Sequence, residues 1–153
     1  MISDSILSNI KKYIEIRCLL PANEDDIIKA EKQLDLKFPA ELVDLLKTSN
    51  GLELLMEHPT SKEPMVYDIA YWPVNEVVSS SNNMNKLFID DKSNKRLLCF
   101  AGNGCGNVFC YIYDGDTLLP SIWIYYPIDG EICFFADNIS EWSKEWFSGN
   151  KQT

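Results

Sequence analysis

Two short segments place carboxylates close together along the chain: Asp114-Gly-Asp116 and Asp129-Gly-Glu131. Two carboxylates held near each other can act as a general acid and base, or bind a hard cation. Aspartate and glycine are also the residues that tight turns between strands select. We therefore assign both segments first to turns, and we expect their negative charge to face a basic partner.

The other candidates for catalysis or ligand binding lack the neighbours that such chemistry needs. His58 is the only histidine and lies in a polar segment, and no nucleophile motif such as GxSxG occurs. The glycine run 102–106 precedes a strand, so it lacks the helix N-terminus that holds a phosphate. Cys105 and Cys110 have no histidine or second cysteine pair nearby to complete a zinc site. The sequence therefore predicts no enzyme, no metal and no cofactor.

The chain has 153 residues and a net charge of −9, from 14 Lys and Arg against 23 Asp and Glu. This length fits one typical domain, and we predict a single domain over residues 1–153. A negative field repels phosphate backbones, which argues against direct nucleic-acid binding and favours a basic protein partner. Acidity also serves solubility alone, so the charge does not identify that partner, and the oligomeric state stays open.

Five cysteines without a CxxC pair favour a reducing compartment. The N-terminal segment lacks the basic start and unbroken apolar run of a signal peptide, and no run of 18 apolar residues occurs. We therefore expect a cytoplasmic protein that does not enter a membrane.

Apolar residues recur at helical spacing in three segments of the first third of the chain. Polar residues suited to capping precede the first two segments, Pro39 fits the first turn of the third, and Gly51 fits its end. The predicted helices cover residues 6–16, 23–34 and 38–50.

Strand-forming residues dominate most of the remaining chain. Residues 65–72 predict a strand that Pro73 ends before a short helix over 74–78, while 79–85 fit a loop or a helix start, and 86–90 a helix or a strand. Later apolar runs separated by short turns predict an antiparallel meander, and Asp137-Asn138 can cap a final helix. These runs cover residues 96–101, 107–113, 121–126 and 131–135. The fold class is therefore α+β, with a mainly antiparallel sheet of about four to six strands packed by N-terminal helices and a C-terminal helix.

The meander strands are apolar or aromatic on both alternating faces, as in 108–113 and 122–126. One face should be core, and the other is either covered by helices or exposed to a partner, because aromatic residues are enriched in interfaces. From charge and aromatic character we select the following partner-binding candidates: Asp114, Asp116, Trp123, Tyr125, Asp129 and Glu131.

Several ordered motifs resemble the SUKH superfamily. Residues 28–51 are similar to its opening motif, in which a helix bearing a Glu and a Leu leads into a Phe-Pro helix start and finishes in Asn-Gly. The glycine turn and strand 104–111, the hairpin 124–131 and the helix start 136–142 also match, although Asn107 stands where the family usually has Asp and the middle region matches weakly. We assign to structure the motif residues Glu31, Phe38, Pro39, Gly51, Gly104, Gly106 and Trp142.

The resemblance implies an α+β protein-binding scaffold. Members of this superfamily act chiefly as bacterial immunity proteins that bind and block a toxin domain, often a nuclease or another nucleic-acid-modifying enzyme. Fungal relatives are linked to cell-wall regulation. The leading expectation is an immunity protein that neutralises a cognate basic toxin, and the alternative is a regulatory or scaffolding module, for example in envelope control.

Overall fold

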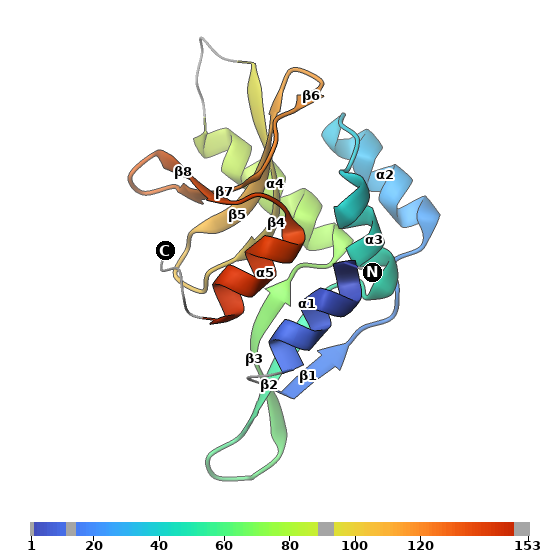
Figure 1. Cartoon of the computed structure of the whole chain (residues 1–153), viewed down its shortest axis with the longest axis vertical. Helices are drawn as coiled ribbons and strands as arrows, with labels where there is room; N and C mark the ends of the chain where they lie inside the picture. The colour runs from blue at the N-terminus through green and yellow to red at the C-terminus, as the bar shows by residue number, and fades with distance from the viewer. Residues whose placement is uncertain (1, 12–14, 89–93, 149–153) are drawn as a thin grey trace.

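The structure is a computed structural model that describes residues 2–11, 15–88 and 94–148. It confirms the α+β class (Figure 1). The helices are α1 (Ile2–Lys11), α2 (Glu24–Leu34), α3 (Ala40–Thr48), α4 (Val74–Leu87) and α5 (Ile139–Ser148). The strands are β1 (Glu15–Cys18), β2 (Leu52–Glu57), β3 (Pro64–Tyr71), β4 (Lys95–Gly102), β5 (Val108–Asp114), β6 (Thr117–Leu118), β7 (Ile122–Tyr126) and β8 (Glu131–Ala136).

Strand pairing among the described residues is antiparallel and divides between two sheets. The first has the order β1-β2-β3, and the second has the order β4-β5-β7-β8 with β6 paired to β5. The Trp72 N–H donates to the carbonyl of Phe100 at 2.8 Å, which joins the end of β3 to β4. The expected single sheet is divided at this point because Pro73 follows and has no N–H to extend the ladder.

The prediction of a helix over residues 6–16 is wrong at its end, where Glu15–Cys18 form β1. This strand pairs with β2, for example Cys18 with Leu52, and β2 itself was missed. Residues 12–14 of the expected helix lie outside the described residues. The pairing in the first sheet outweighs the local helical spacing, and Ile16 packs against the main core from β1.

Helix α2 begins and ends as predicted, whereas α3 is shorter than the predicted 38–50, with Pro39 at its N-cap and Ser49 at its C-cap. The Asn23 side chain accepts a hydrogen bond from the Asp26 N–H at 2.8 Å and caps α2. The Asn50 side chain accepts from the Val74 N–H at 2.8 Å, so a residue in the turn after α3 also caps the first turn of α4. Gly51 has φ +92°, and a Cβ there would lie 3.0 Å from Pro73, so both backbone strain and crowding require glycine.

Helix α4 is longer than the short helix predicted over 74–78, and it includes the ambiguous residues 79–85. Two of its polar residues bond the backbone of β4. The Ser81 hydroxyl accepts from the Cys99 N–H at 2.8 Å, and Asn85 bonds both the N–H and the carbonyl of Leu97, at 2.8 and 2.9 Å. These side chains satisfy the outer edge of β4, which explains a polar helix against a strand.

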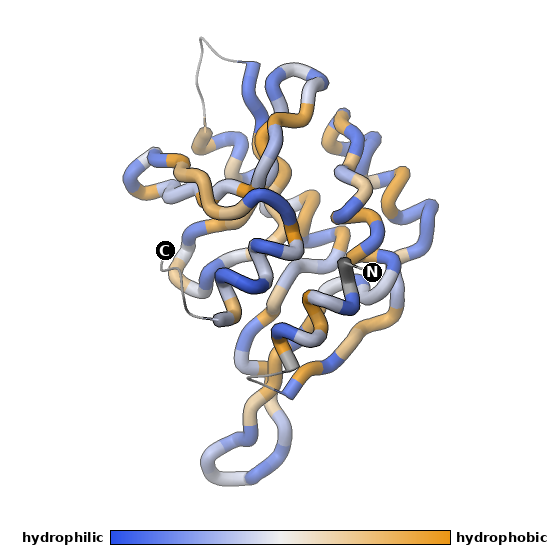
Figure 2. The backbone as a smooth tube through the Cα atoms, in the orientation of Figure 1, coloured by the Kyte–Doolittle hydropathy of each residue, from blue (hydrophilic) through white to orange (hydrophobic). Residues whose placement is uncertain are grey.

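The second sheet is buried on both faces at β5. Phe109, Tyr111 and Tyr113 point into the main core, which α1, α2, α3 and α5 complete. Val108 and Cys110 point to the opposite face, where α4 covers them. In Figure 2, hydrophobic and hydrophilic residues alternate along the helices that flank the strands. For β5, the alternative in which helices cover both faces is confirmed.

Candidate protein-binding surface

The two acidic turns lie at opposite ends of the second sheet. Tyr113 pairs with Leu118 beside the first turn, whereas Val108, at the other end of β5, pairs with Tyr125 beside the second. Six residue steps separate Val108 from Asp114, which is about 20 Å along a strand. The structure therefore does not bring the six predicted contact residues together.

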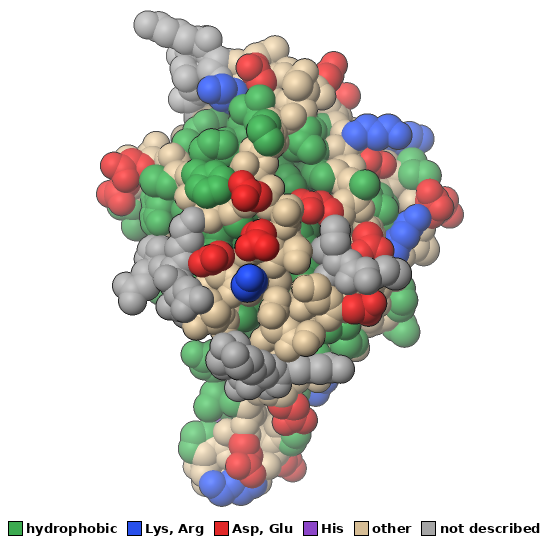
Figure 3. All heavy atoms as spheres, in the orientation of Figure 1, with side chains coloured by type: hydrophobic (Ala, Val, Ile, Leu, Met, Phe, Trp, Pro, Cys, Tyr) green, Lys and Arg blue, Asp and Glu red, His purple; other side chains and the backbone are tan. Residues whose placement is uncertain are grey.

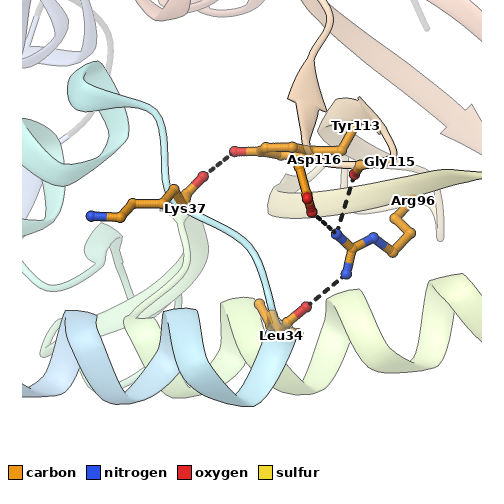
Figure 4. Close-up of polar contacts among 6 residues, drawn as sticks. All are labelled: Leu34, Lys37, Arg96, Tyr113, Gly115 and Asp116. Atoms are coloured by element: carbon orange, nitrogen blue, oxygen red, sulfur yellow. Dashed lines mark hydrogen bonds and ion pairs between the residues drawn. The ribbon is translucent and has the colours of Figure 1, made fainter.

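The first turn, Asp114–Asp116, is the docked turn, because it is tied to the helices (Figure 4). The guanidinium of Arg96 donates to the carbonyls of Leu34 and Gly115, at 3.1 and 3.2 Å, and lies 3.8 Å from the Asp116 carboxylate. The Leu34 carbonyl belongs to the last turn of α2, where a cation is favourable. Asp114 and Asp116 are exposed, but Arg96 fixes the turn as part of the scaffold.

Tyr113 provides a second tie at the docked turn. Its hydroxyl donates to the carbonyl of Lys37 in the loop between α2 and α3 (Figure 4). Burial raises the pKa of Tyr113 above its ordinary value, and the negative charge of Glu31 adds to this effect. The hydroxyl therefore stays protonated and donating at neutral pH.

The second turn, Asp129–Glu131, is the open turn. It is closed locally by the Gly130 N–H, which donates to the Tyr126 carbonyl at 2.8 Å. Both acidic residues are exposed, and the neighbouring Ile128 is 95% exposed. A Cβ built on Gly130 would meet no atom within 4 Å. Within residues 2–11, 15–88 and 94–148, no hydrogen bond or ion pair joins this turn to a helix, unlike the docked turn.

The two aromatic candidates differ in access. Tyr125 is 1% exposed and packs edge-on against Phe88 at 5.4 Å, so its side chain is buried with Val108 and Cys110 on the face of the sheet opposite the main core. Trp123 is half-buried, donates from its indole N–H to the Pro120 carbonyl at 3.3 Å, and packs edge-on against Phe134 at 6.0 Å. Phe134 is 48% exposed. Sequence reasoning missed Ile128 and Phe134, although alternation along β8 predicts one exposed aromatic there.

The hairpin surface, as we define it, consists of five exposed or half-exposed residues of the β7–β8 hairpin: Trp123, Ile128, Asp129, Glu131 and Phe134. The charged side chains in the segment that contains this surface all have the same sign. Residues 97–143 contain no Lys or Arg, and all six of their charged side chains are acidic: Asp114, Asp116, Asp129, Glu131, Asp137 and Glu141. In Figure 3, acidic side chains gather over α5 and at the tip of the β7–β8 hairpin. Two thirds of the net charge of −9 thus comes from this segment.

The β2–β3 hairpin is a second surface with exposed apolar side chains. Met56, Val66 and Tyr67 are 42%, 41% and 63% exposed, and the hairpin extends away from the rest of the molecule (Figure 1). Its charges are mixed, because Lys62 lies between Glu57 and Glu63. It therefore lacks the uniform negative charge of the hairpin surface.

The residues weighed for catalysis have structural surroundings. The Nδ1 atom of His58 accepts from the N–H groups of Thr60 and Ser61, each at 3.1 Å, which orders the turn of the β2–β3 hairpin. Cys110 is buried, and burial raises the pKa of its thiol, so it is not a thiolate nucleophile at neutral pH. Among the described residues, no three His, Cys, Asp or Glu side chains form a group that could hold a metal ion. Within the same residues, no helix is long and apolar enough to cross a bilayer.

Two of the motif residues assigned to structure, Glu31 and Trp142, make contacts that hold the fold together. The Glu31 carboxylate accepts from the Phe38 N–H at 2.7 Å and orients the entry to α3. Trp142 is fully buried and packs edge-on against Phe100 and Phe109, at 5.0 and 5.6 Å.

Fold and surface together define a small acidic α+β domain with an exposed aromatic hairpin. The sequence model of the SMI1/KNR4 family (SUKH-1) matches residues 21–145, and the chain belongs to this family. The family is known for toxin-immunity and SMI1/KNR4-like proteins and is generally a non-enzymatic domain. No curated protein matches the chain.

Proposed function

We propose that this protein is an immunity-type protein that binds a basic toxin domain, such as a nuclease, through the hairpin surface and occludes its active site. The observation that carries the proposal is the lack of any cationic side chain in residues 97–143, next to the half-buried Trp123 and the exposed Ile128 and Phe134. Family membership supports it, because toxin immunity is one of the family's known roles.

Charge and aromatic character supply different parts of such an interaction. A uniformly negative surface accelerates encounter with a basic partner, and this steering weakens as salt screens the charges. Aromatic side chains then provide most of the affinity, since Trp and Tyr are enriched among the residues that dominate binding energy. Blocking a nuclease requires no catalytic group on the inhibitor, only a surface that covers the cleft through which the substrate enters.

The experiment is a protection assay against the toxic domain of the protein encoded beside this chain's gene. The wild-type chain should form a stoichiometric complex and restore growth. The variant Asp129→Lys/Glu131→Lys should slow association by at least about ten-fold at low salt and reduce protection. The matched variant Glu57→Lys/Glu63→Lys makes the same charge change at the β2–β3 hairpin and should protect like wild type.

The reverse pattern, with protection lost only at the β2–β3 hairpin, would move the binding surface there. If the neighbouring protein is not toxic and does not bind, immunity is excluded for that pair. Stable capture of an envelope or regulatory protein in its place would favour the scaffolding alternative.

A further inference from the structure

A second site lies beside the hairpin surface, where β3, α4 and the turn between β4 and β5 meet. It is a cavity of about 290 Å³, which we name the glycine-turn pocket, and its walls include Asp68, Trp72, Met84, Gly104 and Val108. One row of paired residues crosses the sheet from this pocket to the hairpin: Gly102, Val108, Tyr125 and Ile132. Three strand spacings amount to about 14 Å, so one bound protein could reach both sites.

The walls combine apolar surface with one carboxylate. Ile69, Trp72, Met84 and Val108 supply the apolar part, and Asp68 is the only charged residue among the lining residues. Gly102 leaves room for the indole, because a Cβ there would lie 3.1 Å from the Cζ2 atom of Trp72. The pocket therefore offers an aromatic ring, an aliphatic wall and a negative charge.

Asp68 has bonding capacity left for a ligand. Its Oδ1 atom accepts from the Ile69 N–H at 2.7 Å. Within the described parts of the chain, no hydrogen bond or ion pair reaches Oδ2, which lies 3.7 Å from the position of a Cβ on Gly104. A half-buried carboxylate beside apolar walls is best satisfied by a cation.

We propose that the glycine-turn pocket receives the side chain of an arginine or lysine from the bound protein partner. The aliphatic stem would pack on Met84 and Val108, and the cationic head would meet Asp68 and the Trp72 ring, an arrangement that combines a charge-assisted hydrogen bond with a cation–π contact. The Asp68 carboxylate would repel an anionic ligand. A wholly apolar ligand would bury this carboxylate without offering it a partner. This inference rests on the proposed function, because it names the anchor by which a basic partner is held.

The first test uses a small probe and needs no partner. N-acetyl-arginine amide, whose blocked ends imitate an arginine within a chain, is titrated into the full protein while NMR follows the indole N–H of Trp72. We expect a saturable shift with the arginine probe and none with N-acetyl-citrulline amide, its neutral isostere. Asp68→Asn should weaken binding by about ten-fold or more, whereas Glu57→Gln, which removes one exposed charge elsewhere, should not.

The outcomes separate this inference from the proposed function. Equal shifts with the arginine and citrulline probes would overturn it, and so would an unchanged affinity in Asp68→Asn with an unchanged melting temperature. Free L-arginine binding far more tightly than the blocked probe would replace the protein side chain with an amino-acid ligand. If a toxin partner is found and Asp68→Asn binds it like wild type, the pocket assignment fails while the proposed function stands. If the probe binds but no toxin is neutralised, the proposed function fails alone.

Discussion

The docked turn and the open turn have nearly the same sequence and different surroundings. Both contain an Asp-Gly pair followed by an acidic residue, and their glycines have similar left-handed backbones, with φ +62° at Gly115 and +70° at Gly130. Arg96 and Tyr113 join the docked turn to α2 and the loop that follows it. The open turn has local closure and an almost fully exposed Ile128 beside it.

This difference shows that tertiary contacts decide whether an Asp-Gly turn is part of the scaffold or is available for recognition. An Asp-Gly turn satisfies the backbone in both places, so its presence in the sequence indicates a hairpin and nothing more. The two turns differ because Arg96, 18 residues before Asp114, bonds both the docked turn and the end of α2. The docked turn is held by the scaffold, whereas the open turn keeps its charges available for a partner.

The largest expected effect is at Arg96. Arg96→Met keeps much of the aliphatic packing but removes both hydrogen bonds to the Leu34 and Gly115 carbonyls. We expect a loss of about 2 kcal/mol in the free energy of unfolding, measured by urea denaturation at neutral pH. Lys144→Met, on the exposed side of α5, is the control and should change it little. A loss below about 0.5 kcal/mol at Arg96 would show that the docked turn is not held from the helices.

The next effect appears at high pH. A buried tyrosine whose folded pKa exceeds that of the unfolded chain, about 10, contributes stability that is complete below pH 10 and is lost as the pH rises above it. Burial raises the pKa of Tyr113 at the docked turn and, beside the open turn, of the half-buried Tyr126. Between pH 10 and 11, the unfolding free energy should fall by up to about 1.4 kcal/mol less in Tyr113→Phe than in the wild type.

Tyr126→Phe should flatten that fall less, because Tyr126 is the more exposed of the two side chains. Ile122→Val, a mild core truncation, should keep the wild-type slope, which separates ionisation from general loss of stability. Equal slopes in wild type and Tyr113→Phe would contradict a buried, protonated hydroxyl at the docked turn.

The glycines of the two turns should respond alike. Gly115→Ala and Gly130→Ala each force a Cβ into a left-handed backbone, and we expect each to cost about 1 kcal/mol in thermal or urea unfolding. Space is not limiting at either site, since the nearest atom to a Cβ on Gly115 is 3.5 Å away and Gly130 is open. A much larger loss of unfolding free energy at Gly115 would mean that the backbone of the docked turn is held more rigidly than that of the open turn.

The sequence predicted the elements whose signals are local. Asn23 and Pro39 marked the starts of α2 and α3, Gly51 marked the turn after α3, and the Asp-Gly turns marked the hairpins, because capping and turn chemistry depend on a few neighbouring residues. Strands β1 and β2 were missed because each depends on the other for pairing, and the apolar residues before β1 also fit a helix. The length of α4 was missed because its polar residues Ser81 and Asn85 suggested a loop. Their place in a helix is explained only by their hydrogen bonds to the β4 backbone.

The candidate surface was predicted only in part, for the same reason. Asp129, Glu131 and Trp123 lie on the β7–β8 hairpin, but Tyr125 is buried under Phe88, and the docked turn lies at the opposite end of the sheet. Strand register decides which turns meet, and it cannot be derived from turn residues alone. The absence of cations from 97–143 was visible in the sequence and is the signal that predicts the charge of this surface.

The smallest expected effects concern the carboxylates themselves. Asp116→Asn removes an ion pair between Arg96 and a fully exposed carboxylate, so it should lower the unfolding free energy only slightly, with the difference shrinking in high salt. Asp129→Asn removes a charge that stands near Glu131 in a chain of net charge −9, so it should leave stability unchanged or raise it slightly at low salt. Paired urea titrations at low and high salt would measure both changes. If Asp129→Asn destabilised the fold more than Asp116→Asn, the open turn would have a structural role. Its carboxylates would then contribute to folding stability and would not be free to bind a partner.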